Sequence, residues 1–394
     1  MSGHIEILIG PNGYGKTTYL NKKLEKLSKA GETCISLGAE ILPSDDVKGS
    51  KDSSWAIRNI VPTLIETKDY NEKIELLKTS INKNVDANIN PLNELLNEVL
   101  EINDCTRTTD AITSTNKLKI TKQINISDEL QDLIGDGQRM QFLLGIIRLS
   151  NNENIFIDEP EKYSHPSMIN RTANQINKLI NEGRNVYLAT HSPKLISMLN
   201  VSLNDIFIIN DSSHKLKKIK YQTAIDNAIA AGVKKENLPK IYSKYYNSEF
   251  QLLTLLRERY NEKYIEALFS KNVIICEGIN DYLYVKKAIE MYGYNEKDYC
   301  IFQAWGKFCI PIFISLFKQI EINCIVLYDH DDTSKPKHKI SNKAINNLKP
   351  NFKHCFKPKL EDDIGFNGDK EQTLEFIEFL DKLGKKKFID LKIH

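Results

Sequence analysis

The chain has 394 residues, a formal net charge of +2, 41% hydrophobic residues and 27% charged residues. This composition is that of an ordinary globular protein long enough for two domains, and it leaves nucleic-acid binding open because a basic patch can hide in a balanced total. No apolar run approaches the roughly 18 residues of a membrane span, and the seven cysteines form no C-x-x-C pair, so we expect a cytoplasmic protein with reduced thiols, no signal peptide and no membrane contact.

The first predicted element is a strand over Ile5–Ile9, which runs into a glycine-rich segment. This segment fits G-x-x-x-x-G-K-[ST] in full. Its glycines let backbone N–H groups surround a phosphate, Lys16 places a charge on the β- and γ-phosphates, and Thr17 offers a hydroxyl to Mg²⁺. The pattern predicts a site for ATP or GTP, with the binding residues Gly10, Asn12, Gly13, Gly15, Lys16, Thr17 and Thr18.

A long insertion follows at about residues 43–130. Apolar residues at helical spacing over 69–100 predict helices, and the Thr- and Asp-rich stretch Asp104–Asn116 predicts a loop. A helical lobe that caps the ATP site is favoured over a surface that grips a partner or the other subunit.

The segment Leu133–Gln141 opens a predicted helix that continues through Ile147. Its glycines free the backbone, and a helix N-terminus faces any anion that approaches. Such a helix is useful if it closes over the ATP of a second subunit. We therefore expect a homodimer or higher homo-oligomer, in which Gly135, Gly137 and Gln138 contact the partner's nucleotide.

Two later strands end in polar residues. The strand Asn154–Ile157 runs into Asp158 and Glu159, and a second buried strand runs into His191. Parallel strands deliver such residues to the nucleotide crevice. We expect Asp158 to hold Mg²⁺ together with Thr17, Glu159 to polarise the attacking water, and His191 to reach the γ-phosphate.

These motifs, in this order, resemble the ABC-type ATPase head over residues 1–210. The segment Asp158–Pro166, in which a Glu and a His-Pro follow Asp-Glu, is characteristic of the soluble branch found in DNA-repair and phage-defence proteins. The signature reads Gly-Asp-Gly-Gln here, where transporters have Ser-Gly-Gly-Gln. The resemblance implies a P-loop α/β fold that binds and hydrolyses ATP.

After a predicted helical connector over residues 211–270, strand and helix alternate again. Two apolar strands run into Glu277 and into the Asp329–Asp331 segment. In a parallel sheet these ends lie side by side, with Asp281 one helical turn from Glu277. Carboxylates this close repel one another unless a cation sits among them, and oxygen ligands suit Mg²⁺ or Mn²⁺. Four or more acids could hold two metals for phosphodiester displacement.

This acidic pattern resembles the TOPRIM domain of topoisomerases, primases and certain nucleases, with a core over about 271–360 and an extension to residue 394. The resemblance implies that Glu277 is catalytic, that Lys307 contacts phosphate, and that one lysine of 385–387 assists the transition state. It also implies the metal ligands Glu277, Asp281, Asp329, Asp331 and Glu361.

An ABC-type head joined to a TOPRIM domain is the architecture of the overcoming-lysogenisation-defect (OLD) family. This resemblance implies an ATPase and metal-dependent endonuclease for DNA or RNA in anti-phage defence, with room for an accessory defence protein. Lysines over 335–359 fit a nucleic-acid backbone, although such a run is often only a solvated face. The main alternative is an ATPase switch without nuclease activity that binds a partner or phage protein. A repair-type ATPase that tethers DNA ends is disfavoured, because the long coiled-coil heptads expected between its ATPase motifs are absent from the sequence. A transporter nucleotide-binding subunit is disfavoured by the second acidic site.

Overall fold

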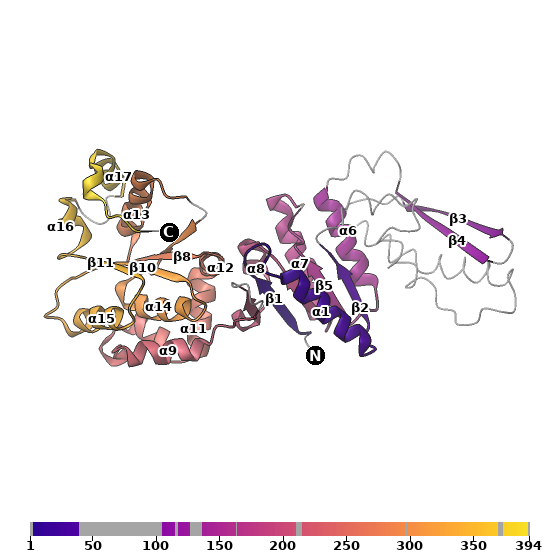
Figure 1. The fold of residues 1–394 in the computed structure, drawn as a ribbon, viewed down its shortest axis with the longest axis horizontal. Coiled ribbons are helices and arrows are strands. Elements are labelled where there is room, and N and C mark those ends of the chain that lie inside the picture. Colours follow the sequence, from indigo (N-terminus) through magenta and orange to yellow (C-terminus); the bar gives the residue numbers. More distant parts are fainter. Residues whose placement is uncertain are drawn as a thin grey trace. The chain divides into compact units, whose positions relative to one another are not determined.

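The computed structural model describes residues 3–38, 105–114, 117–126, 136–162, 164–209, 215–295, 298–368 and 373–392 (Figure 1). The chain divides into two compact units, Met1–Ile209 and Asn210–His394. The segment predicted as a connector over 211–270 therefore belongs to the same compact unit as the acidic strands. Within the described ranges, no helix combines the length and the apolar character needed to cross a membrane.

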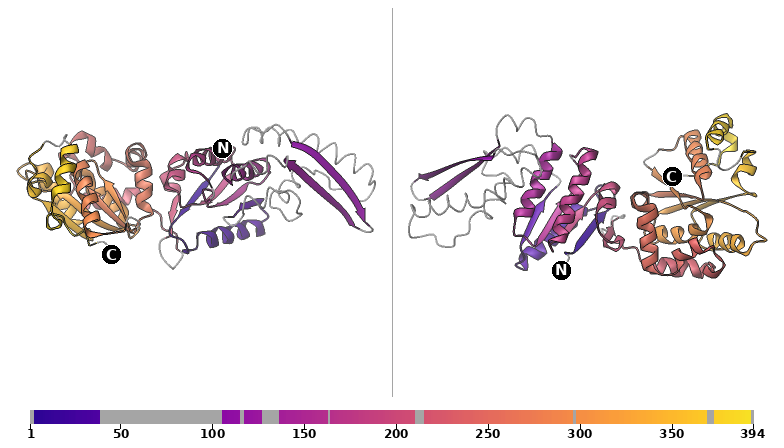
Figure 2. Two further views of the ribbon diagram at one scale, coloured as in Figure 1. Left: turned by 90° about the horizontal axis from the view of Figure 1, so that it is seen from above. Right: turned by 180° about the vertical axis from the view of Figure 1, so that it is seen from behind.

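The first unit is built on a parallel five-stranded sheet of order β2-β5-β6-β1-β7. Helix α1 lies on one face of this sheet, and α6, α7 and α8 lie on the other (Figure 2). Both faces are covered, so the central strands β5 and β6 are buried along almost their whole length. The strands are β1 (Ile5–Ile9), β2 (Cys34–Leu37), β5 (Asn154–Asp158), β6 (Asn185–Ala189) and β7 (Ile206–Ile208), and the helices are α1 (Lys16–Lys29), α6 (Asp136–Leu149), α7 (Ile169–Asn181) and α8 (Pro193–Met198).

The insertion contains a two-stranded antiparallel hairpin of β3 (Cys105–Ser114) and β4 (Lys117–Ile126). The prediction of a loop over Asp104–Asn116 is therefore wrong. Threonine is β-branched and favours a pleated strand, and an adjacent segment of equal length pairs with every residue of β3. The helices predicted over 69–100 lie outside the described residues.

The second unit has a parallel four-stranded sheet of order β11-β10-β8-β9. Helices α13 and α17 cover one face, and α9, α14 and α15 cover the other (Figures 1 and 2). The strands are β8 (Asn272–Cys276), β9 (Tyr299–Gln303), β10 (Asn323–Asp329) and β11 (Phe352–Phe356). The helices are α9 (Tyr221–Ala230), α10 (Lys240–Ser243), α11 (Glu249–Leu255), α12 (Asn261–Leu268), α13 (Ile279–Tyr292), α14 (Ile310–Lys318), α15 (Pro336–Asn347), α16 (Leu360–Ile364) and α17 (Thr373–Lys382).

The α/β class predicted from the sequence is confirmed, and the parallel sheets explain where the polar residues gather. Every strand of a parallel sheet points the same way, so the residues that follow the strands meet at one edge, the one formed by the carboxyl-terminal ends of the strands. In the first unit this edge carries Asp158 at the end of β5 and the segment that begins at Gly10 after β1. In the second unit it carries Glu277 after β8 and Asp329 at the end of β10.

Candidate functional site

The phosphate-binding loop of the first unit joins β1 to α1 and needs glycine at its start. A Cβ atom on Gly10 would lie 2.0 Å from the carbonyl oxygen of Ile209. The Lys16 ammonium is almost buried and donates to the carbonyl oxygens of Gly10, at 2.9 Å, and Pro11, at 3.1 Å. Burial lowers the pKa of Lys16, while nearby carboxylates, Glu159 first, act in the opposite direction. A phosphate that replaced these two carbonyl oxygens as acceptor would therefore contact a poorly solvated ammonium group.

The two residues predicted to hold Mg²⁺ at this site come together across the sheet. The Thr17 hydroxyl donates to Oδ2 of Asp158 at 2.6 Å. The other oxygen of Asp158, Oδ1, is buried and has no hydrogen-bond partner among the described residues, and burial raises the pKa of this carboxyl group. A hydroxyl and a carboxylate beside a phosphate loop are the protein ligands of nucleotide-bound Mg²⁺. The residues present thus fit the expected ion.

Glu159 and His191 also meet, as the sequence predicts. Nε2 of His191 lies 3.2 Å from Oε1 of Glu159, and Glu159 has a left-handed backbone conformation with φ of 49°. Burial and the charge of Lys16 lower the pKa of His191, and Glu159 opposes both effects. This pair can orient a water molecule or a γ-phosphate between a carboxylate and an imidazole.

Glu161 is a residue of this site whose role the sequence did not reveal. Its Oε1 accepts a hydrogen bond from the Thr190 hydroxyl at 2.7 Å and another from the backbone N–H of His191 at 2.6 Å. Burial raises the pKa of Glu161. Hydrogen bonds from the Thr190 hydroxyl and from the backbone N–H groups of Glu161 and His191 oppose that rise. Glu161 thus fixes the loop that carries His191 relative to Glu159. The sequence signal for Glu161 is its position two residues after Glu159, within the Asp158–Pro166 pattern. That pattern does not indicate which groups its side chain contacts.

The glycine-rich signature is described in part. Gly137 and Gln138 lie in the first turn of α6, whereas Gly135 lies outside the described residues. A Cβ on Gly137 would approach Cγ of Met168 to 3.2 Å. The start of α6 therefore packs closely against the His-Pro segment that follows Glu161, and glycine makes this approach possible.

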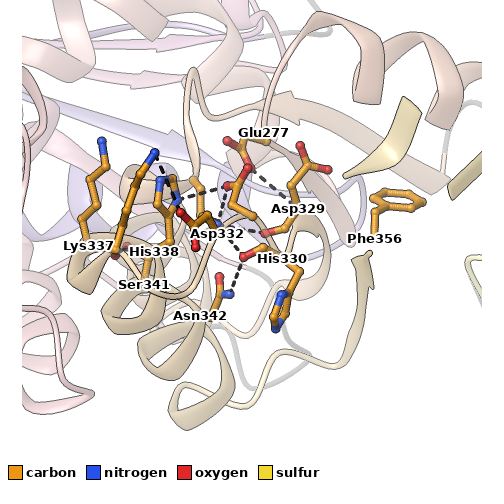
Figure 3. A network of polar contacts seen from close by, with 12 residues as sticks. Glu277, Asp329, His330, Asp332, Lys337, His338, Ser341, Asn342 and Phe356 are labelled. Carbon is orange, nitrogen blue, oxygen red and sulfur yellow. Dashed lines mark hydrogen bonds and ion pairs between the residues drawn. The ribbon is translucent and has the colours of Figure 1, made fainter. Parts of the chain in front are cut away.

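In the second unit, the acids at the ends of β8 and β10 face one another (Figure 3). Oε2 of Glu277 lies 3.5 Å from the backbone nitrogen of Asp329, and Oδ1 of Asp329 accepts from the backbone N–H of Leu360 at 2.9 Å. Desolvation and then the charge of Asp329 raise the pKa of Glu277 to about 7, although Lys307 opposes the rise. The two predicted ligands are thus brought together, and their mutual repulsion is evident.

Two more predicted ligands, Asp281 and Glu361, are buried beside them. Oδ2 of Asp281 accepts from the Gly278 N–H at 2.9 Å, and Oε1 of Glu361 accepts from the Asn280 side chain at 2.8 Å. Within the part of the chain that the structure describes, the second oxygen of each carboxylate is buried without a hydrogen-bond partner. Desolvation, then the charges of Asp329 and Glu277, raise the pKa of Asp281 far above its usual value. Buried, unpartnered carboxylate oxygens among other acids suit a hard divalent cation.

Asp331 and Lys307 depart from the prediction. Lys307 is 0% exposed, and its ammonium donates to Oδ2 of Asp331 at 2.6 Å and to the carbonyl oxygen of Asp329 at 2.9 Å. Nδ1 of His338 lies 3.1 Å from the same oxygen of Asp331. The expectation that Lys307 contacts phosphate is therefore wrong, because its side chain points inward. Asp331 faces a lysine and a histidine.

As they stand, the described residues include no group of three or more His, Cys, Asp or Glu side chains arranged to hold a metal ion. This does not conflict with Mg²⁺ chemistry, because Mg²⁺ usually keeps several waters and binds through one or two carboxylates together with substrate phosphates. Glu277 and Asp329 are the pair placed for this role. The lysines at 385–387 form an exposed 3-10 turn, and Lys385 lies over the ring of Tyr292 at 4.5 Å.

The first unit has a parallel α/β sheet with a P-loop motif, and the second is an acidic α/β unit of the TOPRIM type. Residues 268–331 match the family described as overcoming lysogenization defect protein-like, TOPRIM domain. The Old nuclease of Escherichia phage P2 is 26% identical over 271 residues, which cover 64% of this chain and 43% of the phage protein. Both matches support the resemblance to OLD-type ATPase–TOPRIM proteins that the sequence predicts. The aligned region spans less than half the length of the phage protein.

Solved structures of ATP-binding cassettes also align with this chain. A dimeric structure of the ATP-binding cassette MJ0796, bound to ADP and phosphate, is 13% identical with a TM-score of 0.33, and the match covers 55% of this chain and 86% of that one. An inward-facing metal-chelate type ABC transporter is 14% identical with a TM-score of 0.31, over 55% of this chain and 71% of that one.

Proposed function

We propose that the protein is an ATP-controlled nuclease that cleaves phosphodiester bonds of DNA or RNA with Mg²⁺ or Mn²⁺. The observation that carries this proposal is the pair Glu277 and Asp329, which approach closely at one sheet edge in an OLD-like TOPRIM domain. When bound there, a divalent cation supplies charge stabilisation and an activated water for in-line displacement. Glu277 and Asp329 would hold the ion, while Asp281 and Glu361 would complete its acidic surroundings.

Exposed lysines that follow Asp331 in the sequence support a nucleic-acid substrate. Helix α15 begins a few residues after Asp331, and the segment from there to residue 357 carries a series of exposed lysines. Such a series neutralises phosphates without reading sequence, so binding would be salt-sensitive. The exposed lysines are Lys335, Lys339, Lys343, Lys349, Lys353 and Lys357.

ATP would act through the first unit. Thr17 and Asp158 would hold Mg²⁺, and Glu159 with His191 would orient the attacking water. Two heads would form a homodimer or a higher assembly in which the start of α6 closes over the partner's ATP. The resemblance to the OLD family also supports a cytoplasmic role in anti-phage defence, with an accessory defence protein as a further partner.

The test is a cleavage assay with supercoiled plasmid and total tRNA, in Mg²⁺ or Mn²⁺, with and without ATP. The Glu277→Ala variant should lose cleavage and keep ATP hydrolysis. Asp332→Asn is the matched control, because Asp332 follows Asp331 directly yet its side chain is 55% exposed. This control should cleave like the wild type.

Each result is informative. Cleavage of one substrate that is lost only in Glu277→Ala establishes the nuclease and names its substrate class. Cleavage that survives in Glu277→Ala contradicts the assignment of the acidic site. Intact ATP hydrolysis with no cleavage of either substrate favours the ATPase switch that binds a partner or phage protein. Plaque counts in cells that express the wild type or Glu277→Ala test the defence role.

A further inference from the structure

Lys307 is placed inside the acidic site by the backbone around it. The chain leaves β9 and turns at Gly306, whose φ of 125° suits glycine, and the Gly306 N–H donates to the carbonyl oxygen of Glu277 at 2.9 Å. The next residue is Lys307, whose side chain is fully buried. A hydrogen bond between the two strand ends therefore sets the direction of this side chain, which cannot swing out to solvent without breaking that turn.

Asp331 is held on the other side of this contact. Its backbone has a φ of 54°, and its N–H donates to the carbonyl oxygen of Pro358 at 2.8 Å. Its Oδ2 lies 2.6 Å from the Lys307 ammonium and 3.1 Å from Nδ1 of His338. The Lys307 ammonium also reaches the carbonyl oxygens of Asp329, at 2.9 Å, and His330, at 3.4 Å. Lys307 thus binds the Asp329–Asp331 segment from within.

We infer that Lys307 is a built-in cation for Asp331, so that this site binds one divalent metal ion on the Glu277–Asp329 side and not two. A metal ion on Oδ2 of Asp331 would have to share that oxygen with the buried Lys307 ammonium. Two cations that contact the same oxygen repel each other strongly. Lys307 cannot move away from Asp331, because its side chain is fully buried and its other acceptors are backbone carbonyls of the same segment.

The rest of the acidic cluster differs from Asp331 in a way that locates the one metal ion. Asp281 is 6% exposed and Glu361 is 2% exposed, and each has a buried carboxylate oxygen to which no described residue donates a hydrogen bond. The negative charge of Asp331 is balanced by the Lys307 ammonium, whereas among the described residues these two oxygens have no such positive partner. A single cation near Glu277 and Asp329 would supply it. The inference rests on the proposed function, since it assigns the number of metal ions at that site.

The test counts bound Mn²⁺ in nucleotide-free protein by electron paramagnetic resonance of the free ion. All proteins carry Asp158→Asn, so that the ATP site does not contribute. The reference protein should bind one Mn²⁺ per chain, Asp331→Asn should still bind one with similar affinity, and Glu277→Gln should bind none. A reference protein that binds two, with one lost in Asp331→Asn, overturns the inference and leaves the proposed function intact. A reference protein that binds no Mn²⁺ contradicts both.

A second variant tests the role of the lysine itself. Lys307→Met removes the ammonium and keeps most of the side-chain volume, so Asp331 becomes available and a second Mn²⁺ should bind. Adding Asp331→Asn to Lys307→Met should remove this second ion. Lys335→Met is the control, because Lys335 is exposed, and it should bind one ion. A folded Lys307→Met protein that binds only one ion contradicts the inference. If circular dichroism shows that this variant is unfolded, the Asp331→Asn count decides.

Discussion

Replacing Glu277 by glutamine should make the metal-free protein more stable at alkaline pH. The pKa of Glu277 is raised to about 7 because the carboxylate is desolvated and close to Asp329. The folded protein therefore keeps this proton where the unfolded chain has already lost it. The stability of the wild type then falls as the pH rises from the ordinary value of 4.5 to about 7, and stays low above that. Glutamine resembles the protonated acid and avoids this loss.

The expected size follows from the shift. The pKa rises from 4.5 to about 7, and each unit corresponds to about 1.4 kcal/mol of free energy of unfolding. Glu277→Gln should therefore gain up to about 3 kcal/mol over the wild type near pH 8.5 and nothing near pH 4. Bound Mn²⁺ should reverse the order, because it stabilises only the protein that still has the carboxylate.

Amide hydrogen exchange measured by mass spectrometry resolves this effect, because peptides from β8 and β10 report on the second unit alone. The full chain is compared without nucleotide and with EDTA, near pH 5.5 and pH 8.5, after correction for intrinsic exchange rates. Glu378→Gln, an exposed glutamate of α17, is the control and should show no pH-dependent gain. A Glu277→Gln protein no more protected than the wild type at the higher pH would refute the argument from a buried, repelled carboxylate.

Three further predictions concern the first unit. Lys16→Ala should abolish binding of a fluorescent ATP analogue and leave Mn²⁺ binding at Glu277 unchanged; retained ATP binding would contradict the phosphate-loop assignment. Glu161→Ala should lower kcat for ATP hydrolysis by about a hundredfold with little change in KM, because the His191 loop loses its anchor, and Glu161→Gln should restore most of the rate; equal losses in both variants would contradict a positioning role. Gly10→Ala should lower the free energy of unfolding by about 2 kcal/mol, since its Cβ would lie 2.0 Å from a carbonyl oxygen; an unchanged urea midpoint for peptides of β1 would argue against this close approach.

The positions of most site residues could be predicted because parallel sheets place strand ends together. Thr17 and Asp158 are 141 residues apart in sequence and share a hydrogen bond of 2.6 Å. The pair Glu277 and Asp329 is 52 residues apart and meets at the same kind of edge. In each case an apolar run followed by polar residues was sufficient, since the topology of a parallel sheet leaves one place for those residues.

The wrong or missed predictions have a common physical cause. The conformation or role of each residue depends on contacts with residues that are distant in the sequence. The stretch Asp104–Asn116 is polar and threonine-rich, and its part Cys105–Ser114 is a strand that pairs with β4 along its whole length. The direction of Lys307 depends on a backbone hydrogen bond between Gly306 and Glu277, which no local pattern encodes. Glu161 likewise gains its role from Thr190 and His191, about 30 residues further along the chain.

Both units place a buried lysine among carboxylates at a sheet edge, yet the two lysines are suited to opposite tasks. Lys16 is 5% exposed, and its ammonium donates to the carbonyl oxygens of Gly10 and Pro11. A phosphate can replace these contacts, since charge-assisted hydrogen bonds are stronger than neutral ones. Lys307 is 0% exposed and already has an ionic partner in Asp331 at 2.6 Å. An incoming phosphate offers Lys307 no new kind of contact. For Lys16 it offers an anionic oxygen within hydrogen-bond reach, which no residue of the described ranges supplies. Lys16 is therefore suited to bind a ligand, whereas Lys307 is suited to shape the proposed metal site.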